Sequence, residues 1–308
     1  MVYLTFLKMK NNNMIKRYIF ISFCYIYCFS CTSKKYIVVE TNPIPPNTVY
    51  ISNGLYIDKN EVSNINYREY LFYLEHRYSD NTLYKMALPD TLVWAYYDTC
   101  FSTMVFDYLR TPEFNDYPAV GISYEQAMNY TKWRSDRVME MYLATKIIIK
   151  PDPESKDDAN FSIKKFYSKD YKKCVNADTI SIYPEYSLPT KEDWETAIFF
   201  HEEYVKNSSC NLLKNIRYAS NDWCKAGINP MDVVHPEECR TNIKHLYHLK
   251  GNVCEWIEGG KMCAGGSWVN SLSDIQKSTF FSAKKPEVWV GFRNTCKWKK
   301  WERKNSTQ

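Results

Sequence analysis

Regular periodicity is scarce in this chain, and that scarcity limits the possible folds more than any other feature of the sequence. Only three stretches combine helical spacing of apolar residues with a helix start signal. They cover about residues 64–76, a segment that begins with Ser-Tyr-Glu-Gln at 123–126, and a segment that begins with Thr-Lys-Glu-Asp at 190–193. Both four-residue sequences have the form of a capping box. From about residue 207 onward turn residues dominate, which predicts short strands joined by irregular segments.

The N-terminus has the pattern of an export signal. Lys16 and Arg17 follow a second methionine and precede an uncharged, mostly apolar run over residues 18–30. Thirteen helical residues rise about 20 Å, which is too short for a bilayer core of about 30 Å, whereas a signal peptide has this length. The run ends in Cys28-Phe-Ser-Cys31, which resembles a bacterial lipobox. We therefore expect a signal peptide over residues 1–30 and a lipidated Cys31, with plain secretion or an uncleaved anchor as the alternatives.

The charge of the chain argues against a nucleic-acid partner. Residues 1–30 hold four basic residues and no acidic one, and the rest of the chain has 36 basic and 35 acidic residues. A nearly neutral mature chain has no field that would steer it onto a phosphate backbone. The lipid anchor instead predicts a place in the cell envelope, tethered to a membrane by buried acyl chains.

Composition suggests three further boundaries. Residues 31–48 include the proline-rich sequence Asn-Pro-Ile-Pro-Pro-Asn and are expected to form an extended tether. The folded domain is predicted over residues 49–297, with an insertion at about 141–186 that forms a short hairpin at most. Residues 298–308 are polar and are expected to be a frayed tail.

Five short motifs follow one another along the predicted domain. They are Glu-Val-Ser-Asn at 61–64, Tyr-Pro-Ala-Val-Gly-Ile-Ser-Tyr at 117–124, Leu-Pro-Thr with Asp-Trp-Glu at 188–195, Gly-Asn-Val-Cys-Glu-Trp at 251–256, and Gly-Gly-Ser-Trp at 265–268 with Gly-Phe-Arg at 291–293. In this order they resemble the formylglycine-generating enzyme (sulfatase-modifying factor) family. The resemblance implies an α+β, C-type-lectin-like fold, rich in loops, with two or three helices and short antiparallel sheets.

A narrower resemblance concerns the second helix and the insertion. Trp-Arg-Ser-Asp-Arg-Val-Met-Glu at 133–140, the isoleucines at 147–149 and the insertion before Tyr186 are similar to gliding-motility and type IX secretion lipoproteins of Bacteroidota. That resemblance implies a non-catalytic domain in the cell envelope, anchored in the outer membrane and facing the periplasm. Its partner would be an envelope protein, such as a periplasmic ring subunit of the secretion apparatus.

The chemistry of the family enzyme is missing from the sequence. The resemblance implies oxidation of a substrate cysteine with O₂ and copper(I). Two thiolates hold the copper(I) in the family, because soft sulfur ligands select that ion. The two thiol positions are Asn270 and Ile275 here, and neither side chain carries sulfur. We therefore expect no catalytic residues and a structural or protein-binding role. A lectin-like glycan or peptide receptor and an active copper oxidase are the alternatives.

The resemblance also implies a calcium site in the loop at 251–256. Its ligands would be the carbonyls of Gly251 and Val253 and the carboxylate of Glu255. Calcium needs six to eight oxygen ligands, and His248 stands where the family has an asparagine. The alternative is that Glu255 serves the protein's own hydrogen bonds. Apart from this possible calcium, no cofactor is expected.

Eight cysteines follow Cys31, and an even number in an exported chain suggests disulfides. Their pairing is not fixed by the sequence. If the Gly-Gly-Ser and Gly-Phe-Arg segments are antiparallel neighbours, Cys263 and Cys296 could form one bridge. Cys254 could be a small buried residue or half of a disulfide.

Overall fold

The computed structural model describes residues 42–174, 180–206 and 246–302. The chain divides into two units, residues 1–41 and residues 42–308, and all described residues belong to the second. The predicted signal peptide and Cys31 lie outside the described residues, as do residues 31–41 of the predicted tether. Within the described part of the chain, no helix combines the length and the apolar character that crossing a membrane requires.

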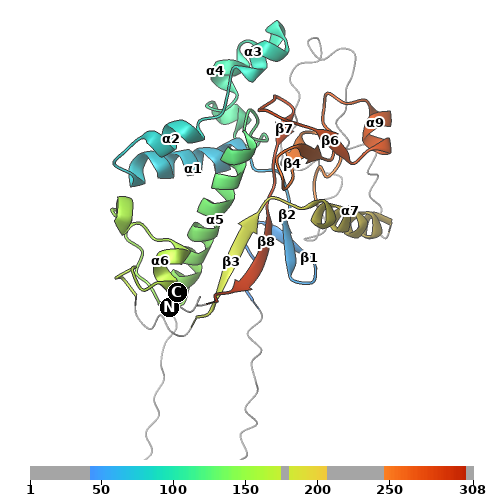
Figure 1. Cartoon of the computed structure of the whole chain (residues 1–308). Coiled ribbons are helices and arrows are strands. Elements are labelled where there is room, and N and C mark those ends of the chain that lie inside the picture. Colours follow the sequence, from blue (N-terminus) through green and yellow to red (C-terminus); the bar gives the residue numbers. More distant parts are fainter. Residues whose placement is uncertain (1–41, 175–179, 207–245, 303–308) are drawn as a thin grey trace, which may run out of the picture. The chain divides into compact units, whose positions relative to one another are not determined.

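One antiparallel sheet joins the two ends of the domain (Figure 1). Its strands, in spatial order, are β1 (Thr48–Ser52), β2 (Leu55–Asp58), β8 (Thr295–Lys300) and β3 (Ile182–Ser187). Strand β8 pairs with β3 along its whole length, and Trp301 beyond it stacks on Tyr167 at 4.6 Å. The prediction of a frayed tail over residues 298–308 is therefore wrong for residues 298–300, which complete an interior strand of the sheet.

A second sheet carries the glycine-rich motifs. Its strands, in spatial order, are β6 (Phe280–Ser282), β5 (Met262–Ala264), β4 (Cys254–Trp256) and β7 (Val290–Gly291). The β5–β6 and β4–β5 pairs are antiparallel, as expected, whereas β4 and β7 run parallel. Both sheets are built from strands of two to six residues, which confirms the expected short strands.

The three predicted helices are present. They are α1 (Asn64–Arg77), α5 (Tyr124–Thr145) and α7 (Lys191–Lys206). Ser123 and Gln126 form the complete capping box of α5, and Thr190 accepts a hydrogen bond from the Asp193 N–H at the start of α7. These starts were readable because each depends only on side chains and backbone groups three residues apart.

Several shorter helices were not predicted. They are α2 (Thr82–Ala87), α3 (Val93–Tyr97), η1 (Thr99–Phe101), α4 (Met104–Asp107), η2 (Pro112–Phe114) and α9 (Leu272–Lys277). Elements of three to six residues are too short to show an amphipathic period, so their apolar residues are read as irregular chain.

The insertion is more ordered than the sequence suggested. It holds η3 (Asp157–Ala159) and α6 (Ile163–Tyr167), where only a short hairpin was expected. Phe161, Phe166 and Tyr171 form a small core with the C-terminal part of α5. The expectation failed because the apolar residues of the insertion are scattered among charges and gather only when the chain folds back on α5.

The part of the proline-rich segment that is described does not hang free. The Trp298 indole donates to the Pro43 carbonyl at 2.9 Å, and Arg134 donates to the Pro46 carbonyl at 3.0 Å. Residues 42–47 of the predicted tether therefore lie against the domain, where their carbonyls accept hydrogen bonds from β8 and α5.

The largest core cluster lies between α1, α5 and the second sheet. Tyr67 of α1 and Tyr130 of α5 stack at 5.8 Å, and Phe292 meets both rings edge-on. Tyr67, Tyr130 and Phe292 are all buried, so burial of aromatic surface fixes α5 against the glycine-rich motifs.

Candidate functional site

The segment after β5 contains both positions that the family resemblance assigns to thiols. The Asn270 side-chain oxygen accepts hydrogen bonds from the Ser267 N–H at 2.9 Å and from the Ser267 hydroxyl at 2.8 Å. Ile275 lies on α9 with 2% of its surface exposed, beneath Gly266, where an added Cβ would come within 2.8 Å of the isoleucine side chain. Both side chains therefore hold the loop in shape, and neither offers a donor to a soft metal ion.

Trp268, between these two positions, is enclosed by an aromatic cluster. Its ring lies 5.2 Å from Tyr97, 6.0 Å from Phe101 and 6.5 Å from Trp94, measured between centroids. The three neighbours belong to α3 and η1, elements that the sequence did not reveal. Trp268 has no exposed surface, so the segment around the positions that the resemblance assigns to thiols is packed from the side of α3.

The predicted calcium loop is organised around a buried ion pair. Arg293 donates from Nε and from Nη2 to the two oxygens of Glu255, at 2.5 Å and 2.6 Å. Both side chains are buried, and burial raises the pKa of the Glu255 carboxyl while Arg293 opposes that rise. The remaining Arg293 donors reach the carbonyls of Asp58, Lys59 and Tyr247.

This arrangement does not fit calcium at Glu255. A divalent ion bound there would have to displace the guanidinium from both carboxylate oxygens. The Gly251 N–H donates to the Gly265 carbonyl, and Val253 is fully buried. The Glu255 carboxylate instead bonds β4 to the segment after β7. Glu255 therefore serves the protein's own hydrogen bonds, which is the alternative that the sequence left open.

A second ion pair extends this buried network. Arg134 of α5 donates to Asp58 at 2.6 Å, and the same carboxylate oxygen accepts from the Asn294 N–H and side-chain amide. Asn252 donates to Glu61 at 2.9 Å. Charged and amide side chains of the first, fourth and fifth motifs therefore meet here, through the Asn252–Glu61 and Arg293–Glu255 contacts.

The observed disulfide differs from the predicted one. Cys254 of β4 is bonded to Cys263 of β5, whereas Cys296 is buried and carries a free thiol. The predicted Cys263–Cys296 bridge is wrong because β5 pairs with β4 and β6, while Cys296 belongs to β8 of the other sheet. Cys100 is disulfide-bonded as well.

A comparison of the chain with models of protein families identifies the family to which these motifs belong. The model of the sulfatase-modifying factor enzyme 1-like domain matches residues 28–297. The chain belongs to this family. The predicted α+β fold class, with short sheets and many loops around α1, α5 and α7, is confirmed.

Three solved structures resemble this sulfatase-modifying factor domain. The crystal structure of CarF shares 13% sequence identity, covers 79% of this chain and 86% of its own, and has a TM-score of 0.41. Treponema denticola variable protein 1 shares 16% identity with coverages of 82% and 92% and a TM-score of 0.38. PvdO from Pseudomonas aeruginosa shares 13% identity with coverages of 81% and 82% and a TM-score of 0.38. No curated protein sequence matches the chain.

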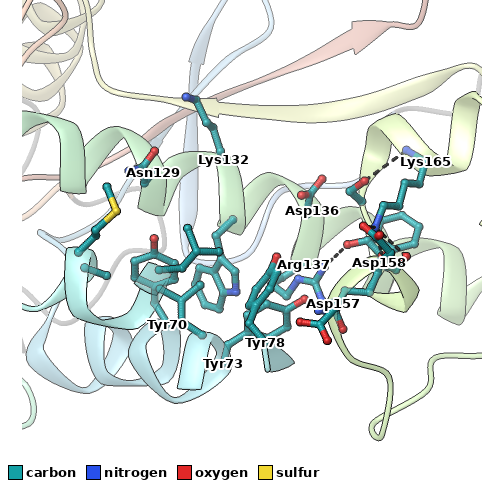
Figure 2. A pocket seen from close by; sticks show the side chains of 18 of the residues that line it. Tyr70, Tyr73, Tyr78, Asn129, Lys132, Asp136, Arg137, Asp157, Asp158 and Lys165 are labelled. Carbon is teal, nitrogen blue, oxygen red and sulfur yellow. Dashed lines mark hydrogen bonds and ion pairs between the residues drawn. The ribbon is translucent and has the colours of Figure 1, made fainter. Parts of the chain in front are cut away.

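A groove of about 530 Å³ between α1 and α5 was missed in the sequence (Figure 2). Tyr70 and Tyr73 of α1 line it together with Trp133 and Arg137 of α5. The helical spacing of the α5 side chains is visible in the sequence, where it predicts a shared helix face but does not predict a cavity. Only the pairing of α5 with α1 turns that face into a wall of the groove.

Proposed function

We propose that this sulfatase-modifying factor domain is a non-catalytic, membrane-tethered protein-binding module of the cell envelope, of the kind used in a gliding-motility or type IX secretion apparatus. One observation carries the proposal. The two positions that hold copper(I) thiolates in the family enzyme carry an asparagine that holds a turn and an isoleucine that fills the core. A scaffold without that sulfur pair acts by contact and not by oxidation.

Other described cysteines do not replace the missing pair. Cys254 and Cys263 are bonded to each other. Cys296 lies buried in the other sheet, and burial raises its thiol pKa well above the usual range, so that it stays protonated. Cys174 lies in the insertion. Among the described residues, no two free thiols lie in the loop that contains Asn270.

The exposed apolar side chains near α3 and α4 support a protein partner. We call this group the α3–α4 patch. It comprises Leu88, Leu92, Tyr96, Tyr97 and Phe106, which are 38%, 48%, 76%, 43% and 71% exposed. Helices α3 and α4 contact each other at one end of the domain (Figure 1). Exposed tyrosine, phenylalanine and leucine side chains are typical of protein interfaces, where tyrosine and phenylalanine are enriched.

Affinity capture of the full-length chain from its own membranes tests the proposal. We expect an envelope protein to co-purify, and the double substitution Tyr96→Ser with Phe106→Ser to reduce its recovery by about tenfold, as removal of interface anchors does. Phe199→Ser is the matched control, because Phe199 is 64% exposed on α7, away from the patch. Capture of no envelope protein, or equal loss in the control, would contradict a specific interface.

Lipidation and catalysis are tested separately. Cys31→Ala should abolish acyl labelling and release the chain from the membrane fraction, since acyl chains supply the anchoring energy. Purified chain given copper(I), O₂ and a cysteine-containing peptide should form no formylglycine. Formation of the aldehyde would refute the non-catalytic assignment and restore the oxidase alternative.

A second candidate function, a lectin-like glycan or peptide receptor, is favoured by a different observation. The groove between α1 and α5 combines aromatic rings with polar side chains, as small-ligand sites do. This candidate does not compete for the α3–α4 patch, because the residues of the patch do not line the groove.

A further inference from the structure

The groove between α1 and α5 is long, and both of its walls are helical (Figure 2). The α5 wall is formed by side chains three or four residues apart, which therefore share one helix face: Gln126, Asn129, Trp133 and Asp136. From residue 126 to residue 137 an α-helix rises about 16 Å. Helix α2 lines one end, and residues 157–165 line the other. The space suits an extended ligand of a few units.

Aromatic rings form much of the α1 side. The Trp133 ring lies 5.1 Å from Tyr70 and 6.0 Å from Tyr73, and Tyr73 lies 6.3 Å from Tyr78. The Arg137 guanidinium lies 4.4 Å from the Tyr73 ring centroid, which holds that ring in place. Tyr73, Tyr78 and Trp133 are each partly exposed. They therefore present fixed, amphipathic surfaces at little further cost in side-chain entropy.

Two polar side chains of α5 retain hydrogen-bonding capacity toward the groove. One Asp136 oxygen accepts from the Ile163 N–H at 2.8 Å, and the other has no partner among the described residues. The Asn129 side chain is exposed and likewise makes no hydrogen bond within the described part of the chain. An acceptor and an amide that both donates and accepts are thus available on one helix face.

The charges of the groove balance, and most of the charged side chains already form hydrogen bonds within the protein. Its lining includes three basic and three acidic residues: Lys132, Arg137, Lys165, Asp136, Asp157 and Asp158. Arg137 donates to Glu140 and to the Phe161 carbonyl, and Lys165 donates to the Asp158 carbonyl. A ligand with a net charge would meet attraction and repulsion together, so the groove favours a neutral ligand.

We propose that this groove binds a neutral saccharide. The C–H face of a sugar ring packs on the tyrosine and tryptophan rings, while its hydroxyls donate to Asp136 and exchange hydrogen bonds with Asn129. A peptide is less suited, because neither wall offers the free strand edge on which an extended peptide would pair. This inference rests on the receptor function and is independent of the α3–α4 patch.

The test uses the full-length chain on an array of neutral oligosaccharides, followed by calorimetric titration of the best one. We expect saturable binding that Asn129→Ala and Asp136→Asn each weaken by about tenfold, the effect of one lost hydrogen bond to a charged or polar group. Gln276→Ala is the matched control, since it removes an exposed amide from α9, outside the groove. Circular dichroism should show all three variants folded.

Any of three outcomes would overturn the inference. One is an array on which the folded chain binds no neutral saccharide. Another is binding that the two groove substitutions leave unchanged. The third is a peptide library that yields a groove ligand where the saccharides yield none. Recovery of an envelope protein reports on the protein-binding function alone. Residues 129 and 136 do not belong to the α3–α4 patch, so their substitution should leave that recovery unchanged.

Discussion

The ion-pair centre around Arg293 and the groove between α1 and α5 use polar residues in opposite ways. At the centre, both Glu255 oxygens and the outer guanidinium nitrogens of Arg293 are bonded within the protein, and neither residue is exposed. In the groove, one oxygen of Asp136 and the whole Asn129 amide have no partner among the described residues.

The difference shows that Glu255 and Arg293 use their hydrogen-bonding groups within the fold, whereas Asn129 and Asp136 keep part of their hydrogen-bonding capacity available in the groove. Glu255 and Arg293 belong to motifs that identify the family, yet they stabilise the junction of the two sheets. Asn129 and Asp136 lie outside the five family motifs, on a face of α5 that lines the groove. Substitutions should therefore separate stability from binding.

The strongest test of the comparison is Arg293→Met. Removal of the guanidinium leaves Glu255 buried without a partner, which should lower the free energy of unfolding by about 3–5 kcal/mol. Urea denaturation followed by tryptophan fluorescence measures this change. Asn129→Ala, on the groove side, should change stability by less than about 0.5 kcal/mol. Equal losses in the two variants would show that the regions do not differ as described.

The disulfide between β4 and β5 should also stabilise the motif region. Its cysteines are nine residues apart, and a loop of this size corresponds to about 2.5 kcal/mol from the restricted unfolded chain. The double substitution Cys254→Ala with Cys263→Ala should lower stability by that amount, whereas Cys296→Ala should leave the bridge intact. Peptide mapping that links Cys263 to Cys296 would contradict the observed pairing.

The groove carboxylate should make stability depend on pH. Burial raises the pKa of Asp136 to about 6, an effect that the Ile163 N–H, Arg137 and Lys165 oppose and Glu140 reinforces. Between about pH 4 and pH 6 the folded chain therefore binds more protons than the unfolded chain, so stability falls as pH rises through this window. Asp136→Asn should remove that dependence and stabilise the chain at pH 8 by on the order of 2 kcal/mol.

A parallel pair of unfolding curves, at pH 4.5 and pH 8, measures this effect in the wild type and in Asp136→Asn. Unchanged pH dependence in the variant would mean that another group is responsible, and would remove the evidence that this carboxylate is held in a partly dehydrated groove.

A smaller effect is expected at Asn270, one of the two positions that the family resemblance assigns to thiols. Asn270→Ala removes the acceptor for the buried Ser267 N–H and hydroxyl, which should cost about 1 kcal/mol. Saccharide binding and partner capture should not change, because Asn270 lies outside both the groove and the patch. A loss of either function would indicate that this loop still serves as a binding site.

Much of the fold could be predicted, because its signals are local. The capping boxes at Ser123 and Thr190 gave the starts of α5 and α7, and the ordered motifs gave the family and the fold class. The short helices α2 to α4 could not be predicted, because helices of four to six residues do not show a period. The partners of Cys263 and the strand formed by residues 298–300 depend on which strands become neighbours, and spacing carries no such information.

The sequence by itself determined the family and the absence of sulfur at positions 270 and 275, since residue identity and the order of motifs need no coordinates. It also determined where the long helices begin, because a cap joins groups only three residues apart. Tertiary structure alone decided that Glu255 meets Arg293, 38 residues away, and that α1 faces α5 across a groove. Those contacts arise when distant segments bury their apolar faces together, and the free energy of that burial belongs to the packed chain and not to any single segment.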